Sequence, residues 1–491
     1  MNSPLRRVTI VVIVLFALMF VNLNWIQFVE HDFYHNNAYN SRVTIAEYSR
    51  PRGSILAGGK TLADSVPAED NDQYKYQRQY PLNEPFAHLT GYQSLIYGDG
   101  GIENLFNGIL SGEDPRLFVD RLSEMFTGTQ VSGGNVLLTI DPDLQVAAWD
   151  ALNGANDGQV GAAVVVDPRS GKVLAQVSTP SYDPNPLASH DANVSQEAWG
   201  AYNAPDAGNP MLDRSTGELY PPGSTMKVVV AAAALEQGIT PNTKIPSGNE
   251  YRPPGAGTTI TNSNDQCPEK ELTLQEALTR SCNTSFARLC VEELGADSVA
   301  RMAEAFGFGD RFTSPLGVVA SSYGDLSDPA FLAQACIGQH DVRVTVMQDA
   351  LISAAIANGG ELMSPQLIEK IQAPDQTTLE IGSEDKYGSP VSGNVAADLR
   401  TMMESVVQSN NGTGTNARVD GFTVGGKTGT AQRGTDEQGN DLPEHGWFTG
   451  YAFNSDGEPV VAVSVLLTAA GPGGSGQATQ IAGDLMRMVL E

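Results

Sequence analysis

One uncharged apolar run constrains this chain more than any other feature. Residues 8–26, VTIVVIVLFALMFVNLNWI, carry no charge and approach the roughly 20 residues that a helix needs to cross a bilayer. Arg6 and Arg7 precede the run, while Glu30 and Asp32 follow it. The positive-inside rule therefore predicts a cytoplasmic N-terminus and a body outside the membrane. A cleaved signal peptide is the alternative, but the run is long for one and no A-x-A-like site follows closely.

Composition excludes several classes of protein. The 491 residues include 57 acidic and 29 basic side chains, for a net charge of -28. Such an acidic chain is a poor ligand for nucleic acid, which is bound by lysines and arginines that neutralise phosphates. Six histidines without a dense Cys/His cluster argue against a structural zinc site. The length suggests roughly two to four globular domains.

Four cysteines are too few for a disulfide scaffold, but single bridges are possible outside the cytoplasm. Cys267 and Cys282 flank a short stretch that can close as a loop, which favours a bridge between them. Buried thiols that pack as small hydrophobic groups are the alternative. For Cys290 and Cys336 the bridge and the buried thiols remain equally open.

The pattern of apolar residues predicts an α+β fold. Residues 28–144 are irregular, with short strand-like runs at 42–48 and 135–140. From residue 161 the signals sharpen, and they comprise a strand–turn–strand at 161–178, helices at 224–237, 272–294 and 344–358, strands at 423–427, 446–453 and 459–468, and a last helix at 478–490. We expect an antiparallel sheet with helices on its faces.

Ser224 is a candidate nucleophile. It follows Pro-Pro-Gly, which lets a helix begin at the serine, and Lys227 then lies on the same helix face. A serine needs an adjacent base to react, and a buried lysine with a lowered pKa can serve. The alternative is an N-cap serine with a solvated lysine. A second S-x-x-K, Ser383 to Lys386, lies in a polar stretch and is interpreted as a chance match.

Ser281, Cys282 and Asn283 form a second polar cluster. They interrupt two apolar helical segments, LTLQEALTR and TSFARLCVEEL, whereas other S-x-N triplets lie in loops rich in glycine or asparagine. The cluster could relay a proton and orient a substrate amide. An ordinary turn between two helices is the alternative.

The third cluster is Lys427, Thr428, Gly429 and Thr430. On an edge strand, Lys427 would supply a cation, the threonines could bind a carboxylate, and Gly429 would permit close approach of a substrate backbone. The N–H groups of Thr430 and Ser224 could form an oxyanion hole. Residues 421–428 also match G-x-x-x-x-G-K-T, but a phosphate-binding loop needs a buried strand before it and a helix after it. The polar flanks argue against that alternative.

The order S-x-x-K, S-x-N, K-T-G resembles the serine penicillin-recognising enzymes. Arg52-Gly53-Ser54-Ile55 is similar to the R-G-x-I box of class B penicillin-binding proteins, and Gly101-Ile102-Glu103, with Leu110 and Gly112, to their G-[IL]-E box. The segments GKVLAQVSTPSYDPN, YPPGSTMK, IGQ and GWFTGYAF also fit. The modest length resembles actinobacterial members. Two departures are AGGK at 57–60, where D-R-N-G is frequent, and Cys282, where serine or aspartate is frequent.

The resemblance implies a transpeptidase that cross-links peptidoglycan stem peptides ending in D-Ala-D-Ala and that β-lactams acylate. It implies no metal or organic cofactor, and a SEDS-type glycosyltransferase such as RodA as membrane partner. It divides the chain into a tail (1–7), an anchor (8–27), a non-catalytic domain (28–150) and a penicillin-binding domain (151–491). The implied site residues are Ser224 as nucleophile, Lys227 as base, Ser281 and Asn283 for proton transfer, and Lys427, Thr428, Gly429 and Thr430 for substrate binding. A D,D-carboxypeptidase, a β-lactamase or a penicillin sensor remains the alternative.

Overall fold

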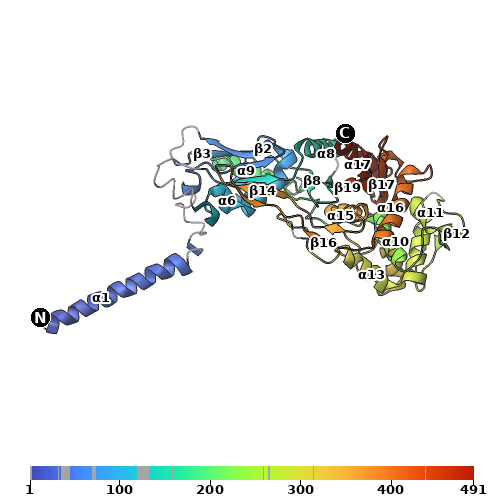
Figure 1. Cartoon of the computed structure of the whole chain (residues 1–491), viewed down its shortest axis with the longest axis horizontal. Helices are drawn as coiled ribbons and strands as arrows, with labels where there is room; N and C mark the ends of the chain where they lie inside the picture. Colours follow the sequence, from blue (N-terminus) through green and yellow to red (C-terminus); the bar gives the residue numbers. More distant parts are fainter. Residues whose placement is uncertain are drawn as a thin grey trace.

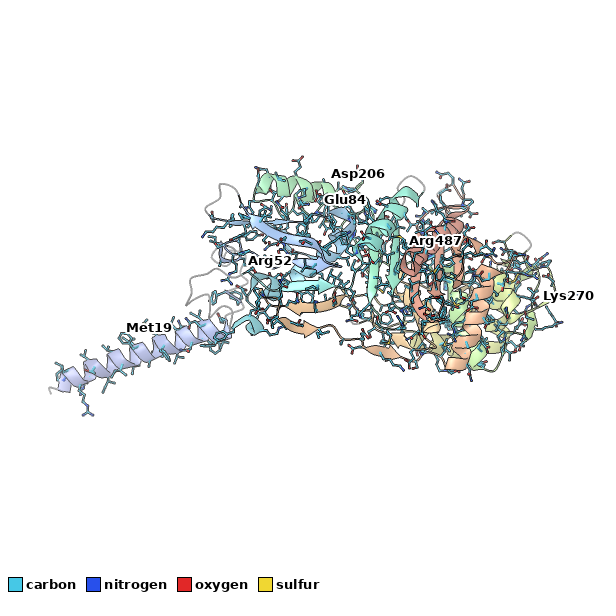
Figure 2. All side chains as sticks on the ribbon, turned by 45° about the horizontal axis from the view of Figure 1, so that its top comes forward. Met19, Arg52, Glu84, Asp206, Lys270 and Arg487 are labelled. Atoms are coloured by element: carbon cyan, nitrogen blue, oxygen red, sulfur yellow. A yellow bond between two sulfur atoms is a disulfide. The ribbon has the colours of Figure 1, made fainter. Side chains whose placement is uncertain are left out.

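The molecule is elongated and has three parts. The computed structural model describes residues 3–30, 33–34, 45–68, 73–118, 132–155, 160–257, 259–263, 266–312, 314–436 and 438–491. In Figure 1 a long helix projects from an N-terminal lobe, and a larger C-terminal lobe lies at the far end. Figure 2 places Met19 on the projecting helix, Arg52 in the N-terminal lobe, and Arg487 and Lys270 in the C-terminal lobe.

The projecting helix contains the predicted apolar run. α1 (Ser3–Asn24) continues into a π-helical turn, η1 (Trp25–Val29). Within the part of the chain that the structure describes, Pro4–Val29 is the one helix long and apolar enough to cross a membrane, and none of its most apolar window is buried. An apolar surface of this size requires lipid or another apolar partner.

A six-stranded sheet organises the N-terminal lobe. Its order is β15-β14-β6-β1-β2-β3, and β1 runs parallel to β6 while the other pairs are antiparallel. The strands are β1 (Ile55–Ala57), β2 (Lys60–Pro67), β3 (Tyr76–Gln79), β6 (Asn135–Leu138), β14 (Ile368–Gln372) and β15 (Thr378–Ile381). Two of the six strands therefore come from residues 368–381, so a division at residue 150 does not separate the two lobes along the chain.

Short elements fill the rest of this lobe. They are η2 (Glu84–Phe86), α4 (Ala87–Thr90), β4 (Gln93–Ser94), β5 (Gly98–Asp99), α5 (Gly101–Leu105), α6 (Asn107–Ser111), η3 (Pro115–Leu117) and α9 (Ala192–Tyr202). The strand predicted at 135–140 is confirmed as β6. The strand predicted at 42–48 is wrong where it can be compared, because residues 45–47 form a helical turn. Residues 42–44 lie outside the described residues.

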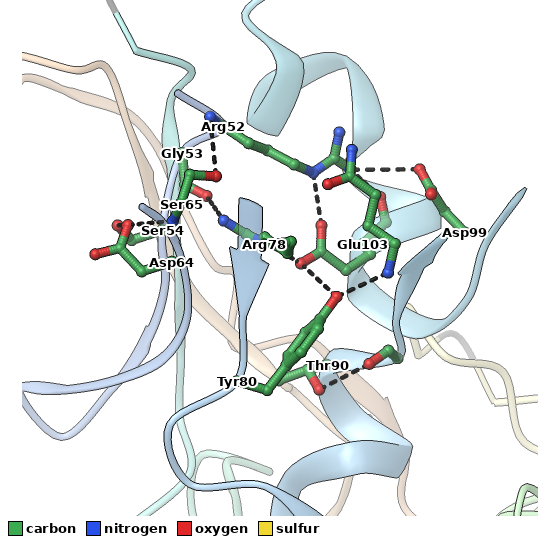
Figure 3. A network of polar contacts seen from close by, with 12 residues as sticks. Arg52, Gly53, Ser54, Asp64, Ser65, Arg78, Tyr80, Thr90, Asp99 and Glu103 are labelled. Carbon is green, nitrogen blue, oxygen red and sulfur yellow. Dashed lines mark hydrogen bonds and ion pairs between the residues drawn. The ribbon is translucent and has the colours of Figure 1, made fainter. Parts of the chain in front are cut away.

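Glu103 joins the two sequence boxes of this lobe. Its carboxylate oxygens accept hydrogen bonds of 2.6 Å from Arg52 Nε and from Arg78 Nε (Figure 3). Arg78 Nη1 also donates to Gly53 O at 2.8 Å. Burial alone would raise the pKa of Glu103, but Arg78 and Arg52 hold that pKa below its usual value. Arg52 of the R-G-x-I box and Glu103 of the G-I-E box therefore form one buried ion pair.

A five-stranded antiparallel sheet organises the C-terminal lobe. Its order is β17-β18-β19-β7-β8, so β17 is an edge strand. The strands are β7 (Gly161–Val166), β8 (Val173–Thr179), β17 (Thr423–Ala431), β18 (His445–Phe453) and β19 (Pro459–Leu467). α8 (Pro142–Gly154) and α17 (Gly474–Leu490) pack on one face, while α15 (Val346–Ala357) packs on the other. The predicted α+β architecture is confirmed.

Helices of the C-terminal lobe surround the buried α10. They are η5 (Gly223–Met226), α10 (Lys227–Glu236), α11 (Leu274–Thr279), α12 (Asn283–Leu289), η6 (Cys290–Leu294), α13 (Ala296–Ala305), α14 (Pro329–Ala335), α16 (Gly393–Gln408) and η7 (Thr415–Ala417). The remaining strands are β9 (Lys244–Pro246), β10 (Glu250–Tyr251), β11 (Ile260–Thr261), β12 (Glu271–Thr273), β13 (Leu362–Met363) and β16 (Lys386–Gly388). The helix predicted at 272–294 is divided, because Ser281 takes a positive φ of 61° between α11 and α12.

Neutralising Glu103 should destabilise the protein strongly. Glu103→Gln keeps the side-chain shape, but it removes the carboxylate that Arg78 pairs with and leaves Arg52 only the more distant Asp99, at 3.5 Å. We expect a loss of about 3–5 kcal/mol in the free energy of unfolding, measured by chemical denaturation. Lys60→Gln is the control, because it removes an exposed ion pair with Asp143 and should cost less than about 1 kcal/mol. Equal losses in the two variants would contradict this account of the lobe.

Candidate active site

Ser224 lies on a turn held against the edge strand. Gly223 has a φ of 56°, in the left-handed region that favours glycine. A Cβ at this position would lie 2.3 Å from Thr430 O. η5 is therefore a 3-10 turn that touches β17, and α10 begins only at Lys227. The helix predicted from Ser224 thus opens with one tighter turn, and Ser224 remains partly exposed.

Lys227 is fully buried beneath this turn. Its Nζ donates to Ser281 O and to Asn283 Oδ1, both at 2.7 Å, and lies 3.3 Å from Ser281 Oγ. Burial, and secondly the charge of Lys427, lowers its pKa well below that of a free lysine. Ser224 and Lys227 are both described by the structure, and Ser224 Oγ does not donate a hydrogen bond to Lys227 Nζ. Lys227 lies one helical turn after Ser224, as predicted. Its amine contacts the S-x-N motif directly.

The S-x-N triplet is a tight turn rather than a helix interior. Ser281 adopts a positive φ, and Asn283 begins α12. Asn283 Nδ2 donates to Thr261 O at 3.0 Å. Cys282, between them, is bonded to Cys267. The backbone turn, the hydrogen bond to Thr261 and the neighbouring disulfide therefore fix the directions of the Ser281 and Asn283 side chains.

The K-T-G residues lie on β17. Lys427 Nζ donates to Ser281 Oγ at 2.8 Å and to Thr428 O at 2.9 Å. Burial lowers the pKa of Lys427 to about 7. Thr428 Oγ1 lies 2.6 Å from Thr413 Oγ1. At Gly429 a Cβ would lie 2.7 Å from Pro222 O, so this position has no room for a side chain.

The three motifs meet at one hydroxyl. Ser281 Oγ lies 2.8 Å from Lys427 Nζ and 3.3 Å from Lys227 Nζ, although these lysines are 146 and 54 positions away in the chain, respectively. Burial lowers the pKa of both amines, and the charge of Lys427 lowers that of Lys227 further. The cluster can therefore accept, hold and return a proton near Ser224.

Neither alternative motif has the structure that its chemistry needs. Lys386 Nζ pairs with Glu361 at 2.5 Å, and Ser383 Oγ donates to Asp385, so the second S-x-x-K is an exposed loop and strand. Residues 421–428 run into β17 with no helix after them. The phosphate-binding loop is thereby excluded.

Two supporting contacts were not predicted from the sequence. Asp349 lies buried beneath the nucleophile turn, where it hydrogen-bonds Ser464 Oγ at 2.8 Å and interacts with Thr225. Burial raises the pKa of Asp349 to about 6. The available signal was a single acid in the largely apolar α15, whose other polar residues are Gln348 and Ser353. The Thr413–Thr428 contact had no comparable signal, because the two threonines lie in unrelated loop and strand patterns.

Comparison with known proteins defines the class. The penicillin-binding protein transpeptidase domain matches residues 161–487, and the penicillin-binding protein A dimerisation domain matches residues 52–136. The chain belongs to the class B penicillin-binding protein transpeptidases, as the order of its motifs predicts.

Particular relatives match along nearly the whole chain. Peptidoglycan D,D-transpeptidase PbpA of Mycolicibacterium smegmatis is 40% identical over 471 residues, which are 95% of this chain and 94% of the relative. PbpA of Mycobacterium tuberculosis is 38% identical over 498 residues, covering 100% and 99%. The solved ceftriaxone acyl-enzyme complex of penicillin-binding protein A from M. tuberculosis has a TM-score of 0.85 at 38% identity, covering 91% of this chain and 100% of that chain. The predicted resemblance to actinobacterial members is confirmed.

Two disulfides allow a matched test of how the S-x-N turn is held. Cys267–Cys282 closes a separation of 15 residues at the site, while Cys290–Cys336 closes one of 46 residues. Replacing either pair by serines should cost about 2–4 kcal/mol of stability. Only Cys267→Ser/Cys282→Ser should also slow acylation by a fluorescent penicillin, severalfold, because Ser281 loses its neighbour's tether. Equal acylation rates in the two double variants would show that the turn does not depend on its bridge.

Proposed function

We propose that this chain is a D,D-transpeptidase that cross-links peptidoglycan stem peptides through an acyl-enzyme on Ser224. The observation that carries the proposal is the pair of buried amines, Lys227 and Lys427, around the Ser281 hydroxyl. The family membership and the names of the mycobacterial relatives support it.

Lys227 is the base. A neutral amine has two N–H groups, and Lys227 uses them on Ser281 O and Asn283 Oδ1. Its lone pair then remains for a hydroxyl proton from Ser224, one helical turn away. Burial and the charge of Lys427 lower the pKa of Lys227 and so favour the neutral amine, which is what general-base catalysis needs.

Ser281 relays the proton. Its oxygen accepts from Lys427, so its own hydrogen can pass to the departing amine while Lys227 replaces it. Asn283 holds Lys227 through Oδ1, and it donates one Nδ2 hydrogen to Thr261 O, which leaves the second Nδ2 hydrogen for a substrate amide. These roles require the fixed turn between α11 and α12.

The edge strand binds the substrate. Lys427 and Thr428, with Thr430, hold the terminal carboxylate of D-Ala-D-Ala, and Gly429 lets the edge strand that binds the substrate pack closely on the nucleophile turn. The N–H groups of Ser224 and Thr430 form the oxyanion hole, supported by the close packing of Gly223 on Thr430.

The reaction is a double acyl transfer. Ser224 Oγ forms an ester with the penultimate D-Ala carbonyl, the bond to the last D-Ala breaks, and the serine proton leaves with that D-Ala amine. An amine from a neighbouring stem then attacks the ester, forms the new amide and returns a proton to Ser224. A β-lactam acylates the same serine, and its ring-opened product stays attached.

The apolar helix and its flanking charges support a position of this chemistry outside the cytoplasm. Arg6 and Arg7 favour a cytoplasmic N-terminus, with α1 as an uncleaved anchor. A RodA-like glycosyltransferase is the proposed membrane partner, since a transpeptidase needs newly made glycan strands.

Replacing Ser224 tests the nucleophile. Ser224→Ala should release no D-Ala from a pentapeptide donor and form no covalent penicillin adduct, as read by mass spectrometry. Ser383→Ala, in the exposed second S-x-x-K, should behave as the native protein. With an amine acceptor in excess the native protein should yield cross-linked product. Hydrolysed product alone would indicate a carboxypeptidase, an adduct without any turnover would indicate a sensor, and an adduct in Ser224→Ala would overturn the assignment.

The pH dependence of acylation tests the base. The rate should rise with pH as Lys227 loses its proton, with the rise well below the pH expected for an ordinary lysine. Lys427→Ala removes a neighbouring positive charge, which raises the pKa of Lys227 and moves the rise to higher pH. Lys386→Ala, exposed and distant in the fold, should leave the profile unchanged. A rise that stays in place or moves to lower pH in Lys427→Ala would contradict this coupling.

A further inference from the structure

A basic pocket adjoins the active site. It has a volume of about 550 Å³, and its walls include Pro221, Gln339, His340, Arg343, Arg433 and His445. None of these six residues belongs to the three motifs.

The pocket shares its walls with the substrate groove. Gly223, beside the nucleophile, donates its N–H to Gly338 O at 2.9 Å. The next residue, Gln339, donates from Nε2 to Thr430 O at 3.5 Å. Arg433 follows two residues after β17 ends at Ala431. A ligand that extends past Thr430 along the edge strand therefore reaches the pocket.

Two arginines in this pocket lack carboxylate partners. Arg343 Nη1 donates to His340 O at 2.6 Å and to Val342 O at 2.8 Å, which fixes the guanidinium. Arg433 Nη1 donates to Pro443 O at 3.5 Å. Among the described residues, neither arginine has an acidic group within salt-bridge distance, although acidic residues outnumber basic ones 57 to 29. The one acid paired at the pocket is Asp341, 3.4 Å from His340 Nε2.

His445 adds a neutral donor. Its Nδ1 accepts the N–H of Ala469 at 3.3 Å. Burial, and then the charges of Arg433 and Arg343, lower its pKa to about 4. The ring is therefore neutral, and its single hydrogen is on Nε2. Guanidinium groups and an N–H without competing acceptors match an anion, and the planar fork of arginine matches a carboxylate.

The direction of the substrate decides which carboxylate arrives there. This step rests on the proposed function, in which the side chains of Lys427, Thr428 and Thr430 hold the C-terminal carboxylate and the Thr430 N–H binds the scissile carbonyl. Moving from the C-terminus of the substrate towards its N-terminus follows β17 forward. At about 3.3 Å per extended residue, the backbone of the residue before D-Ala-D-Ala lies beside Ala431 or Gln432, and its long side chain extends forward to Arg433 in the pocket.

We propose that this pocket binds a side-chain carboxylate on the third residue of the donor stem peptide. The protein would then favour donors whose diamino acid carries its own carboxylate, as in diaminopimelate, over donors with lysine. The amine end of the same side chain remains outside the pocket.

Three synthetic pentapeptide donors isolate this group. They carry diaminopimelate, its side-chain carboxamide or lysine at the third residue, and the glutamyl carboxylate is amidated in all three. Calorimetry measures the affinity of each donor for the full-length Ser224→Ala protein in detergent. This affinity tests the pocket in the absence of turnover. D-Ala release by the native protein reads the proposed function separately. We expect the carboxylate donor to bind about tenfold or more tightly than the other two.

Arginine variants decide the assignment. In the Ser224→Ala background, Arg343→Gln/Arg433→Gln should remove the preference for the carboxylate donor and leave lysine-donor binding unchanged. Arg169→Gln, an exposed arginine in the turn between β7 and β8 that pairs with Asp167, should keep the preference. Equal binding of all donors by Ser224→Ala, a preference that survives the double arginine replacement, or an equal loss for every donor would each overturn the proposal. Donor-selective binding without D-Ala release from the native protein would support the pocket while refuting the transpeptidase.

Discussion

Burial of α10 is the constraint on which the site depends. Residues 227–235 are buried along their whole length, so the first turn of this helix cannot shift without disrupting the core. Lys227 has to lie inside with them, and its amine must be met by fixed acceptors. Ser281 and Asn283 provide these. The hydrophobic effect that packs the helix therefore also sets the position and the proton affinity of the base.

The N-terminal lobe follows a similar principle with opposite charges. There a buried carboxylate, Glu103, lies between two arginines, and a glycine, Gly53, supplies a carbonyl to one of them. In the C-terminal lobe two amines lie around a hydroxyl, and among the described residues no carboxylate forms an ion pair with either of them. The first arrangement pairs opposite charges and stabilises the lobe. The second leaves a proton weakly held, which suits catalysis.

Short sequence patterns predicted the features of the site that depend only on residues close together in the chain. The pair Ser224 and Lys227 followed from one helical turn, and the edge-strand position of Lys427 followed from three consecutive strand signals. The addition of β14 and β15 to the first sheet was missed because short strands do not specify a partner more than 200 residues away. The basic pocket was missed for a related reason, since Arg343 and Arg433 become neighbours only through the fold. Convergence of the motifs was predicted through family resemblance rather than spacing.

The position of β14 and β15 late in the chain affects how the N-terminal sheet forms during synthesis and how the lobe can be re-engineered. β14 pairs with β6, so the first sheet stays open at that edge until residue 372 has left the ribosome. Bringing these segments together closes a very long loop, which makes the pairing slow relative to local structure. An unpaired β6 edge is meanwhile available to other chains. A chimera that transplants the lobe onto another enzyme must therefore carry both the N-terminal strands and residues 368–381, because neither segment alone contains all six strands of the sheet.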